Sequence, residues 1–290
     1  MTIAVPRLQR DLSRGTVLAV TSVGSVQFGA ALATELFPRV GPLGTVTLRL
    51  IGGALVLLAL TRPWRRRWTR PEIGASVLFG AVFTMMNASL YLALDRLPLA
   101  TVITVEFLGP LSVAVVAASS WRTRIWALPA GAGVALLGGT LSGGDLVGVS
   151  CALAAAGCWA AYILLSGKIG RTGSGLDGLA VASLFGAILV LPVGLGTAGT
   201  ALFNPATMCL GLAVGVLSSA IPYSLDLLAL RRLPTAVFGV LTSLNPAVAA
   251  AAGLIVLGQQ LSAREIIGIA LVVLAGAGVT LGSGQRQLDT

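Results

Sequence analysis

The sequence Asp-Arg-Leu-Pro at 95–98, with Glu-Phe-Leu-Gly-Pro at 106–110, returns 136 positions later as Arg-Arg-Leu-Pro at 231–234 and Thr-Ser-Leu-Asn-Pro at 242–246. Both copies lie in a chain that is almost continuously apolar. Secondary transporters are built from duplicated membrane units whose helices are interrupted at matching places, and their substrate sites lie where the repeats meet. The sequence therefore predicts a transporter made of two repeats, residues 1–143 and 144–290.

The composition indicates a membrane protein. Of the 290 residues 56% are hydrophobic and only 10% are charged, and the mean hydropathy is +0.94, whereas soluble domains carry about 25% charged residues. Charged residues fall in short interruptions spaced roughly as membrane-crossing helices require. We predict an all-α membrane protein with ten transmembrane helices at about 16–36, 42–61, 72–94, 98–119, 124–142, 147–167, 178–198, 207–229, 235–257 and 265–283.

The distribution of cations predicts the topology. With the amino terminus in the cytoplasm, fifteen of the nineteen lysines and arginines lie in cytoplasmic segments, three lie on the opposite side, and Arg49 falls inside a span. This asymmetry obeys the positive-inside rule and predicts that both termini are cytoplasmic. Because each half contains five spans, the second half enters the membrane from the other side, and the two five-helix repeats are inverted. The expected location is the cytoplasmic membrane of a bacterium.

Several function classes find no support in the sequence. The net charge of +9 lacks the aromatic-interleaved patch of a nucleic-acid binder and is explained by topology. Histidine is absent, and Cys151, Cys158 and Cys209 lie in apolar stretches without metal or disulfide spacing. No nucleotide-binding loop or catalytic motif is present, so neither an enzyme nor a cofactor is predicted. The first apolar run is expected to remain as a span rather than be cleaved as a signal peptide.

Four ionisable residues are expected within or at the edge of spans: Glu35, Arg49, Glu106 and Asp226. A charge at bilayer depth costs ~2.5–3.5 kcal/mol on insertion scales, so each needs a partner or water. Glu106 lies near the midplane, where it either functions in transport or pairs with Arg49. Arg49 either binds a substrate carboxylate or pairs with Glu106 or Glu35. Asp226 is a candidate gate or interface salt bridge with Arg231, or a substrate contact.

Pro110 and Pro246 occupy matching positions inside the fourth and ninth spans. Because proline has no amide hydrogen, each frees the carbonyl four residues earlier, which belongs to Glu106 in one copy and to Thr242 in the other. Asn245 joins Pro246 at this predicted helix break. Freed carbonyls at membrane depth are tolerated where they face protein or a water-filled cavity. The breaks therefore predict either a kink that serves packing or, with Glu106 beside one of them, a cavity.

Other polar and aromatic side chains are expected at similar depths. Trp159 and Tyr162 are three residues apart and share one helical face. The candidates to line a substrate cavity, together with Arg49 and Glu106, are Gln27, Asn87, Tyr91, Trp159, Tyr162 and Tyr223.

The chain resembles the threonine/homoserine exporter branch of the drug/metabolite transporter superfamily, which is built from two EamA-type repeats. The resemblance covers nearly the whole chain and rests on Ser25-Val26-Gln27, Leu36-Phe37-Pro38, Leu48-Arg49-Leu50, 105–110, 158–164, 222–226, 230–234 and Phe238-Gly239. It implies export of threonine, homoserine or similar amino acids. The chain departs from the family where it has Asn245-Pro246 instead of Glu-Pro and Gly258-Gln259 instead of Gly-Glu, which argues against coupling by two carboxylates.

These observations lead to one leading hypothesis and two alternatives. In the first, a small amino acid is exported by alternating access, Glu106 meets its ammonium group and Arg49 its carboxylate, and any proton coupling runs through Glu106 or Asp226. Efflux of drugs or hydrophobic cations is the nearest alternative, which Arg49 facing the cavity would disfavour. A non-transporting scaffold would instead pair Glu106 with Arg49 in a dry core. Lipid surrounds the protein in each case, and both a monomer and a homodimer are compatible with the sequence.

Overall fold

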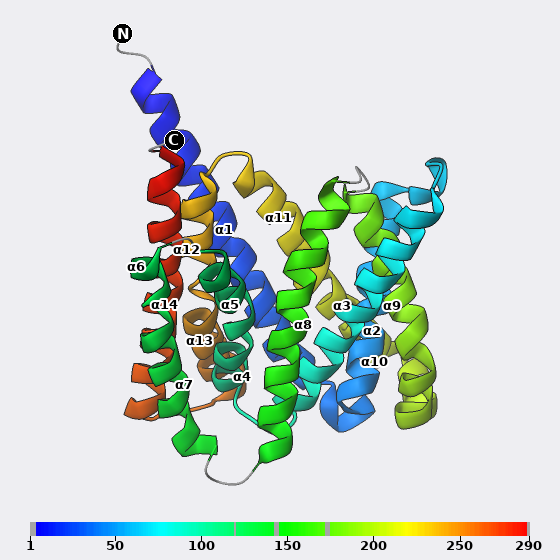
Figure 1. The fold of residues 1–290 in the computed structure, drawn as a ribbon. Coiled ribbons are helices and arrows are strands. Elements are labelled where there is room, and N and C mark those ends of the chain that lie inside the picture. Colours follow the sequence, from blue (N-terminus) through cyan, green and yellow to red (C-terminus); the bar gives the residue numbers. More distant parts are fainter. Residues whose placement is uncertain (1–3, 119, 142–144, 172–174, 289–290) are drawn as a thin grey trace.

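The computed structural model describes residues 4–118, 120–141, 145–171 and 175–288, and within these ranges all regular structure is helical, as predicted (Figure 1). The helices are α1 (Ala4–Thr34), α2 (Phe37–Thr61), α3 (Arg70–Leu94), α4 (Leu99–Glu106), α5 (Leu108–Ala117), α6 (Trp121–Arg124), α7 (Ala127–Leu141), α8 (Leu146–Arg171), α9 (Gly175–Ala198), α10 (Pro205–Gly215), α11 (Ile221–Leu230), α12 (Thr235–Thr242), α13 (Asn245–Leu257) and α14 (Ala263–Leu288). Short 3-10 turns, η1 (Pro63–Arg65) and η2 (Gly199–Phe203), and a π-helical turn, η3 (Val216–Ala220), join some of them.

Nine helical stretches among the described residues are long and apolar enough to cross a membrane. They correspond to all the predicted spans except the fifth, at 124–142, so the predicted number of ten is not confirmed. In that region α6 has only four residues and α7 has 15. A helix of 15 residues is ~22 Å long, shorter than the ~30 Å hydrocarbon core of a bilayer.

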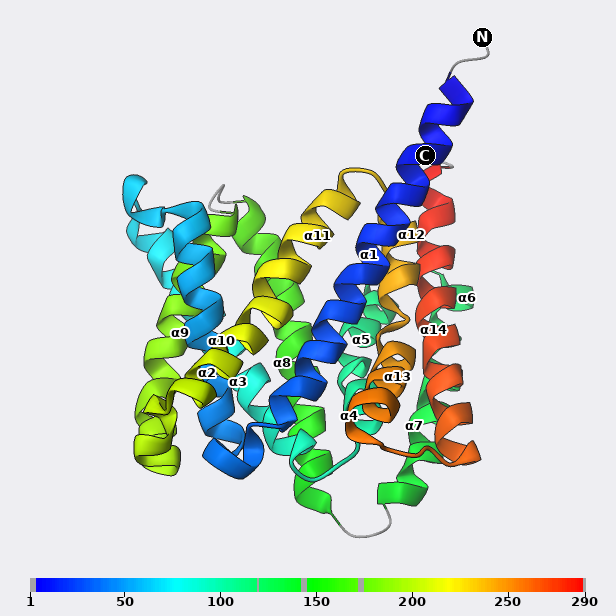
Figure 2. The ribbon, with the colours of Figure 1, turned by 180° about the vertical axis from the view of Figure 1, so that it is seen from behind.

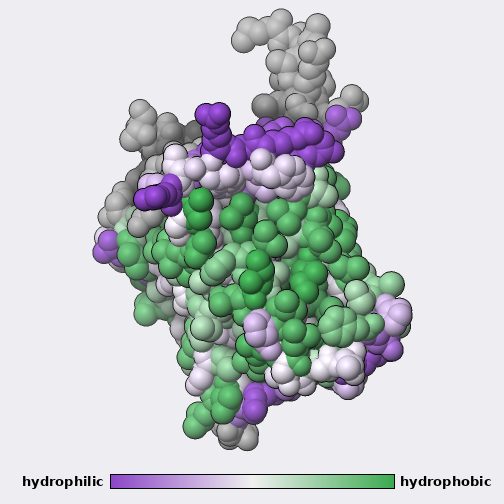
Figure 3. All heavy atoms as spheres, turned by 90° about the vertical axis from the view of Figure 1, so that its right-hand side faces the viewer, coloured by the Kyte–Doolittle hydropathy of each residue, from purple (hydrophilic) through white to green (hydrophobic). Residues whose placement is uncertain are grey.

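The outer surface of the bundle is apolar. Leu55, Leu78 and Ile188, on α2, α3 and α9, are each more than half exposed. Figure 3 shows a broad hydrophobic band with hydrophilic residues gathered mainly at one end of the molecule. Such a continuous exposed apolar surface is far larger than soluble monomers display. It is the surface expected of helices that face lipid.

The two copies of the motif form the same local structure. Helix α3 ends at Leu94 and α11 at Leu230, α4 covers 99–106 and α12 covers 235–242, so every boundary is displaced by 136 residues. Pro98 and Pro234 precede these helices with the same φ of −56° and ψ of 144° and 143°. The turns at 95–98 and 231–234 lie at opposite ends of the bundle. Helix α1 begins, and α14 ends, at the end of the bundle that carries the 231–234 turn (Figures 1 and 2).

The two halves of the chain interleave in space. Helix α2 packs along α9, α3 along α8, α7 along α14 and α1 along α11. Each of these pairs joins a helix of the first half to a helix of the second. The predicted boundary between residues 143 and 144 falls in 142–144, outside the described residues. The halves are therefore units of sequence that share one helical bundle.

Two glycines permit backbone contacts that position the centre of the bundle. A Cβ atom on Gly109 would lie 2.2 Å from the carbonyl oxygen of Ala156, and one on Gly215 would lie 2.8 Å from that of Arg49. No side chain fits at either distance, and small residues of this kind let membrane helices approach closely. Gly109 thus brings α5 against α8, and Gly215 brings α10 against α2.

Asp145 connects the start of α8 to the 95–98 turn through a hydrogen bond and an ion pair. Its carboxylate accepts a hydrogen bond from the Gly148 amide at 2.8 Å and forms an ion pair with Arg96 at 3.2 Å. The Gly148 amide, and then the Arg96 guanidinium, hold the pKa of Asp145 below its usual value. A carboxyl with a lowered pKa stabilises the fold above its unfolded pKa and loses that contribution as the pH falls through its folded pKa.

We therefore expect Asp145→Asn to flatten the acid side of the stability profile. The Tm of the wild-type protein in detergent should fall as the pH is lowered from about 5 to about 3. The Tm of the variant should fall less over the same range. Glu35→Gln, at an exposed position, is the control and should keep the wild-type profile. Equal pH profiles for Asp145→Asn and the wild type would contradict the assignment.

Candidate functional site

A cavity of about 360 Å³ lies at the centre of the bundle, between α1, α2, α3, α4, α8, α11, α12 and α13. Its size is at the small end of ligand pockets, which range over ~300–1,000 Å³. Its walls contain most of the residues selected from the sequence, namely Gln27, Arg49, Asn87, Glu106, Pro110, Trp159, Tyr162, Asp226, Thr242 and Asn245. Pro246 lies behind the wall, and the side chain of Tyr223 is outside the described part of the chain.

Glu106 presents a carboxylate that has no ion pair with any of the described residues. It is the last residue of α4, where the break before Pro110 occurs, and it is only 5% exposed. No described side chain lies within ion-pair distance of it. A buried carboxylate at this depth is costly unless a proton or a cationic group neutralises it. The site therefore favours a ligand with a positive charge next to Glu106.

Arg49 is held by groups other than Glu106. Its Nη1 donates to the Tyr91 hydroxyl at 3.0 Å, and its Cζ lies 5.3 Å from the centre of that ring. Its Nη2 donates to the Ser218 carbonyl at 3.5 Å. Both contacts are neutral, so Arg49, which is 7% exposed, keeps its charge available to an anionic ligand. The predicted alternative of an Arg49–Glu106 ion pair is not formed.

The prediction that Tyr91 lines the cavity is wrong. Tyr91 is fully buried and lies behind Arg49, in contact with the Phe37 ring at a centroid distance of 5.9 Å. Its hydroxyl positions the guanidinium. Tyr91 lies one turn from the cavity residue Asn87 on α3, so the spacing in the sequence places both on one helical face and does not separate them.

The π-helical turn η3 supplies polar groups that the sequence analysis missed. Pro222 has no amide hydrogen, and the Ile221 amide bonds to Val216 five residues earlier, so the carbonyls of Leu217 and Ser218 turn to other donors. Ser25 on α1 donates to the first at 2.6 Å, and Arg49 donates to the second. The proline rule that located Glu106 and Thr242 would, applied to Pro222, have pointed to Ser218.

The second helix break is capped by a side chain. Pro246 cannot donate to the Thr242 carbonyl, and Asn245 Nδ2 donates to it instead at 2.8 Å. Asn245 Oδ1 in turn accepts a hydrogen bond from Gln27 Nε2 at 2.7 Å. Gln27 lies on α1, so this contact joins the two halves of the chain at the cavity wall.

Four buried polar atoms on the cavity residues have no hydrogen-bond partner among the described residues. They are Gln27 Oε1, Arg49 Nε, Asn87 Oδ1 and Ser218 Oγ. Each such atom costs roughly 1–3 kcal/mol if it stays unpaired, and in native structures a ligand or ordered water usually satisfies it. Their convergence on one cavity indicates a binding site for a polar molecule.

Aromatic side chains form another part of the cavity wall. Trp159 meets Phe107 edge-on at a centroid distance of 6.3 Å, and Tyr162 contacts Phe79 at 4.6 Å and Phe83 at 5.9 Å. Phe83 and Phe107 line the cavity but were not selected from the sequence. No signal distinguishes them from the other apolar residues of their helices. This wall limits the size of a bound side chain.

Asp226 lines the cavity on α11, without an ion pair to Arg231 among the described residues. The predicted interface salt bridge is therefore not formed. Ser22 of α1 lies beside this carboxyl and donates to the Pro222 carbonyl at 3.2 Å. Asp226 thus sits where α1 and α11 meet, a contact between the halves.

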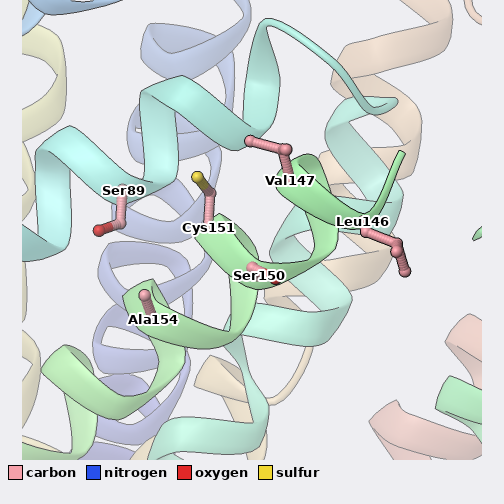
Figure 4. A pocket seen from close by; sticks show the side chains of 6 residues that line it. All are labelled: Ser89, Leu146, Val147, Ser150, Cys151 and Ala154. Carbon is pink, nitrogen blue, oxygen red and sulfur yellow. The ribbon is translucent and has the colours of Figure 1, made fainter. Parts of the chain in front are cut away.

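A second depression lies between α3 and α8 and is lined by Ser89, Leu146, Val147, Ser150, Cys151 and Ala154 (Figure 4). Its lining contains no charged side chain, and it opens to the apolar outer surface. The central cavity is therefore the candidate site.

Comparisons with known proteins agree with this architecture. A model of the EamA-like transporter family matches residues 146–281. The threonine/homoserine exporter RhtA of Salmonella typhimurium LT2 is 40% identical over 268 residues, which cover 91% of this chain and 90% of the relative. The protein of the same name from Escherichia coli K12 is 39% identical over the same extent. A crystal structure of another protein, at 24% identity, shares the fold with a TM-score of 0.61 over 95% of this chain and 99% of that one.

Proposed function

Because this chain belongs to the threonine/homoserine exporters of the EamA-like transporter family, we propose that it exports small amino acids of the threonine and homoserine kind by alternating access. The observation that carries the proposal is the central cavity with Arg49 and Glu106 in its wall and no ion pair between them. A zwitterion offers one anionic and one cationic group on the same carbon. It can neutralise both side chains at once.

The binding mode follows from charge. Glu106 receives the substrate ammonium, and Asn87 Oδ1, which has no partner, supplies a further acceptor. Arg49 receives the carboxylate while the Tyr91 hydroxyl and the Ser218 carbonyl hold its guanidinium in place. Trp159 and Tyr162 then enclose the side chain. Gln27 from the first half and Thr242 from the second complete the wall.

The proposed topology has ten crossings in two inverted repeats, with both termini in the cytoplasm of a bacterium. Support comes from the boundaries displaced by 136 residues, from the two turns at opposite ends of the bundle, and from the cation asymmetry. Helices α6 and α7 together form the tenth crossing, and α7 packs along α14, its counterpart in the second repeat.

In this topology we infer that the cavity is closed toward the outside. Leu36, Leu97 and Leu99 lie at the end of the bundle that carries the 95–98 turn, and all three are buried. This arrangement corresponds to the cytoplasm-facing state of the cycle. Substrate release then requires these residues to separate.

Proton coupling, if it drives export, runs through Glu106 or Asp226. These are the carboxylates in the cavity wall, and histidine is absent from the chain. At Glu106 a proton and the substrate ammonium would compete for the same group. Such competition is a direct way to exchange an inward proton for an outward amino acid.

Two alternative functions, efflux of hydrophobic cations and a non-transporting scaffold, agree less well with the cavity. Efflux of hydrophobic cations suits an aromatic wall with a carboxylate, but Arg49 lines the same cavity and repels them. A non-transporting scaffold requires a packed, dry core, and the cavity with its four unpartnered polar atoms argues against one.

Uptake into inverted membrane vesicles tests the proposal. Labelled threonine, homoserine, other amino acids and a hydrophobic cation are offered with and without a pH gradient. We expect saturable uptake of threonine and homoserine, well above vesicles without the protein, and none of the cation. Saturable uptake of the cation alone would establish the efflux alternative. Uptake of neither class would overturn the proposed function.

A further inference from the structure

The hydrogen bonds around Asn245 fix the orientation of a cavity amide. The Thr242 carbonyl can only accept, so the Asn245 group that bonds to it at 2.8 Å must be Nδ2. Asn245 Oδ1 therefore faces Gln27. Since this oxygen can only accept, the Gln27 atom that donates to it, at 2.7 Å, must be Nε2. The remaining atom is Gln27 Oε1, which is buried and has no hydrogen-bond partner among the residues that the structure describes. We call this chain of hydrogen bonds, from the Thr242 carbonyl through Asn245 to Gln27, the Asn245–Thr242 relay. It exists because Pro246 has no amide hydrogen and leaves the Thr242 carbonyl free.

Asn87 is oriented in a similar way. Its Nδ2 donates to the Phe83 carbonyl at 2.8 Å, and its Oδ1 has no partner. Tyr91, one turn further along α3, holds Arg49. Asn87 therefore belongs to the side of the cavity where Arg49 binds the carboxylate, and the ammonium shares a carbon with that carboxylate. Gln27 comes from α1 and is fixed by the second half of the chain.

We propose that Gln27 Oε1 accepts a hydrogen bond from the side-chain hydroxyl of the substrate, and that the Asn245–Thr242 relay makes the site selective for hydroxylated amino acids over their apolar isosteres. This inference rests on the proposed function. The relay holds Gln27 as an acceptor, so a hydroxyl satisfies a buried atom that a methyl group leaves unpaired. Sites built to bond a hydroxyl reject analogues without it more strongly than apolar pockets reject a change of one methyl group.

Counterflow in proteoliposomes measures the selectivity. Exchange of labelled threonine is measured against two pairs of unlabelled competitors: threonine and valine, and homoserine and norvaline. In each pair the second amino acid has a methyl group in place of the hydroxyl. We expect the wild type to prefer the hydroxylated member of each pair by about tenfold or more, the effect of one buried hydrogen bond. Gln27→Met, which keeps the volume but removes the acceptor, should bring each ratio to within about twofold.

Two further variants separate orientation from stability. Asn245→Leu removes the donor to the Thr242 carbonyl and should lower both Tm and selectivity. Adding Pro246→Ala returns a backbone amide for that carbonyl, so the double variant should regain Tm but not selectivity. Recovery of both would show that the relay does not act by orienting Gln27. Gln259→Met, an amide outside the cavity that accepts from the Leu99 amide, is the control: it should lower Tm and keep the wild-type ratios.

The outcomes for the two proposals differ. Absence of threonine counterflow in the wild type contradicts the proposed function itself. Intact counterflow with unchanged ratios in Gln27→Met overturns the role of Gln27 and leaves export standing.

Discussion

Replacing Glu106 with glutamine is expected to weaken threonine counterflow by about 10- to 100-fold, because a hydrogen bond to a charged group contributes ~1.5–3 kcal/mol and each ~1.4 kcal/mol is a factor of ten in affinity. Glutamine has nearly the same volume and still accepts a hydrogen bond, so the change removes charge rather than packing. The measurement is the concentration of threonine that half-saturates counterflow, with the Tm of each purified variant as a check on folding.

The same variant tests coupling. If Glu106 also carries the proton, Glu106→Gln should abolish the response of transport to a pH gradient even at saturating threonine. Asp226→Asn is the matched comparison, because Asp226 is the other carboxylate in the cavity wall. Loss of the pH response in Asp226→Asn alone would move coupling to α11. An unchanged rate and an unchanged pH profile in Glu106→Gln would remove both roles from Glu106.

The sequence was sufficient to locate the helix breaks. Proline rules act on local backbone, and for that reason α4 ends at Glu106 and α12 at Thr242, as predicted. The same rule at Pro222 frees the Ser218 carbonyl in the π-helical turn. The helix breaks and the freed carbonyls can therefore be predicted from the local sequence alone.

Other features could not be derived from local rules. Gln27 and Asn245 are 218 residues apart, and only the packing of α1 against α13 brings them together. Tyr91 and Asn87 lie one turn apart on α3, yet one is behind Arg49 and the other faces the cavity. Residues four apart share one face of a helix, so their spacing in the sequence cannot separate them. The short length of α7 was also missed, because the apolar run at 124–142 continues across the turn between α6 and α7.

The two copies of the motif differ where they matter for function. Glu106 and Thr242 occupy equivalent positions, and so do Gly109 and Asn245. Gly109 is required because α8 approaches too closely for any side chain, so the first break cannot be capped by an asparagine. The first break therefore offers a charge, and the second offers a neutral amide, Asn245, which bonds to Gln27 of the first half. This asymmetry suits a substrate with charged groups at one end and a hydroxyl at the other.

Replacing Arg49 with glutamine is expected to reduce threonine counterflow more than about 100-fold, since it removes the positive charge from the cavity and leaves the substrate carboxylate without a partner at bilayer depth. Arg49→Lys should recover only part of the activity, because an ammonium group is a point charge and lacks the planar fork that matches a carboxylate. Both variants also release the Tyr91 hydroxyl and the Ser218 carbonyl, so a lower Tm is expected for each.

Tyr91→Phe separates the charge of Arg49 from its positioning. It removes the hydrogen bond at 3.0 Å but keeps the ring beside the guanidinium, so we expect a loss of less than about tenfold, within the ~0.5–1.5 kcal/mol of a neutral hydrogen bond. Arg49→Gln leaves Glu106 as an uncompensated anion beside aromatic walls, an arrangement that attracts cations. Competition by a hydrophobic cation should therefore appear in Arg49→Gln and be absent in the wild type and in Tyr91→Phe. Equal competition in all three proteins would mean that Arg49 does not set the charge of the cavity, and the case for a zwitterionic substrate would fail with it.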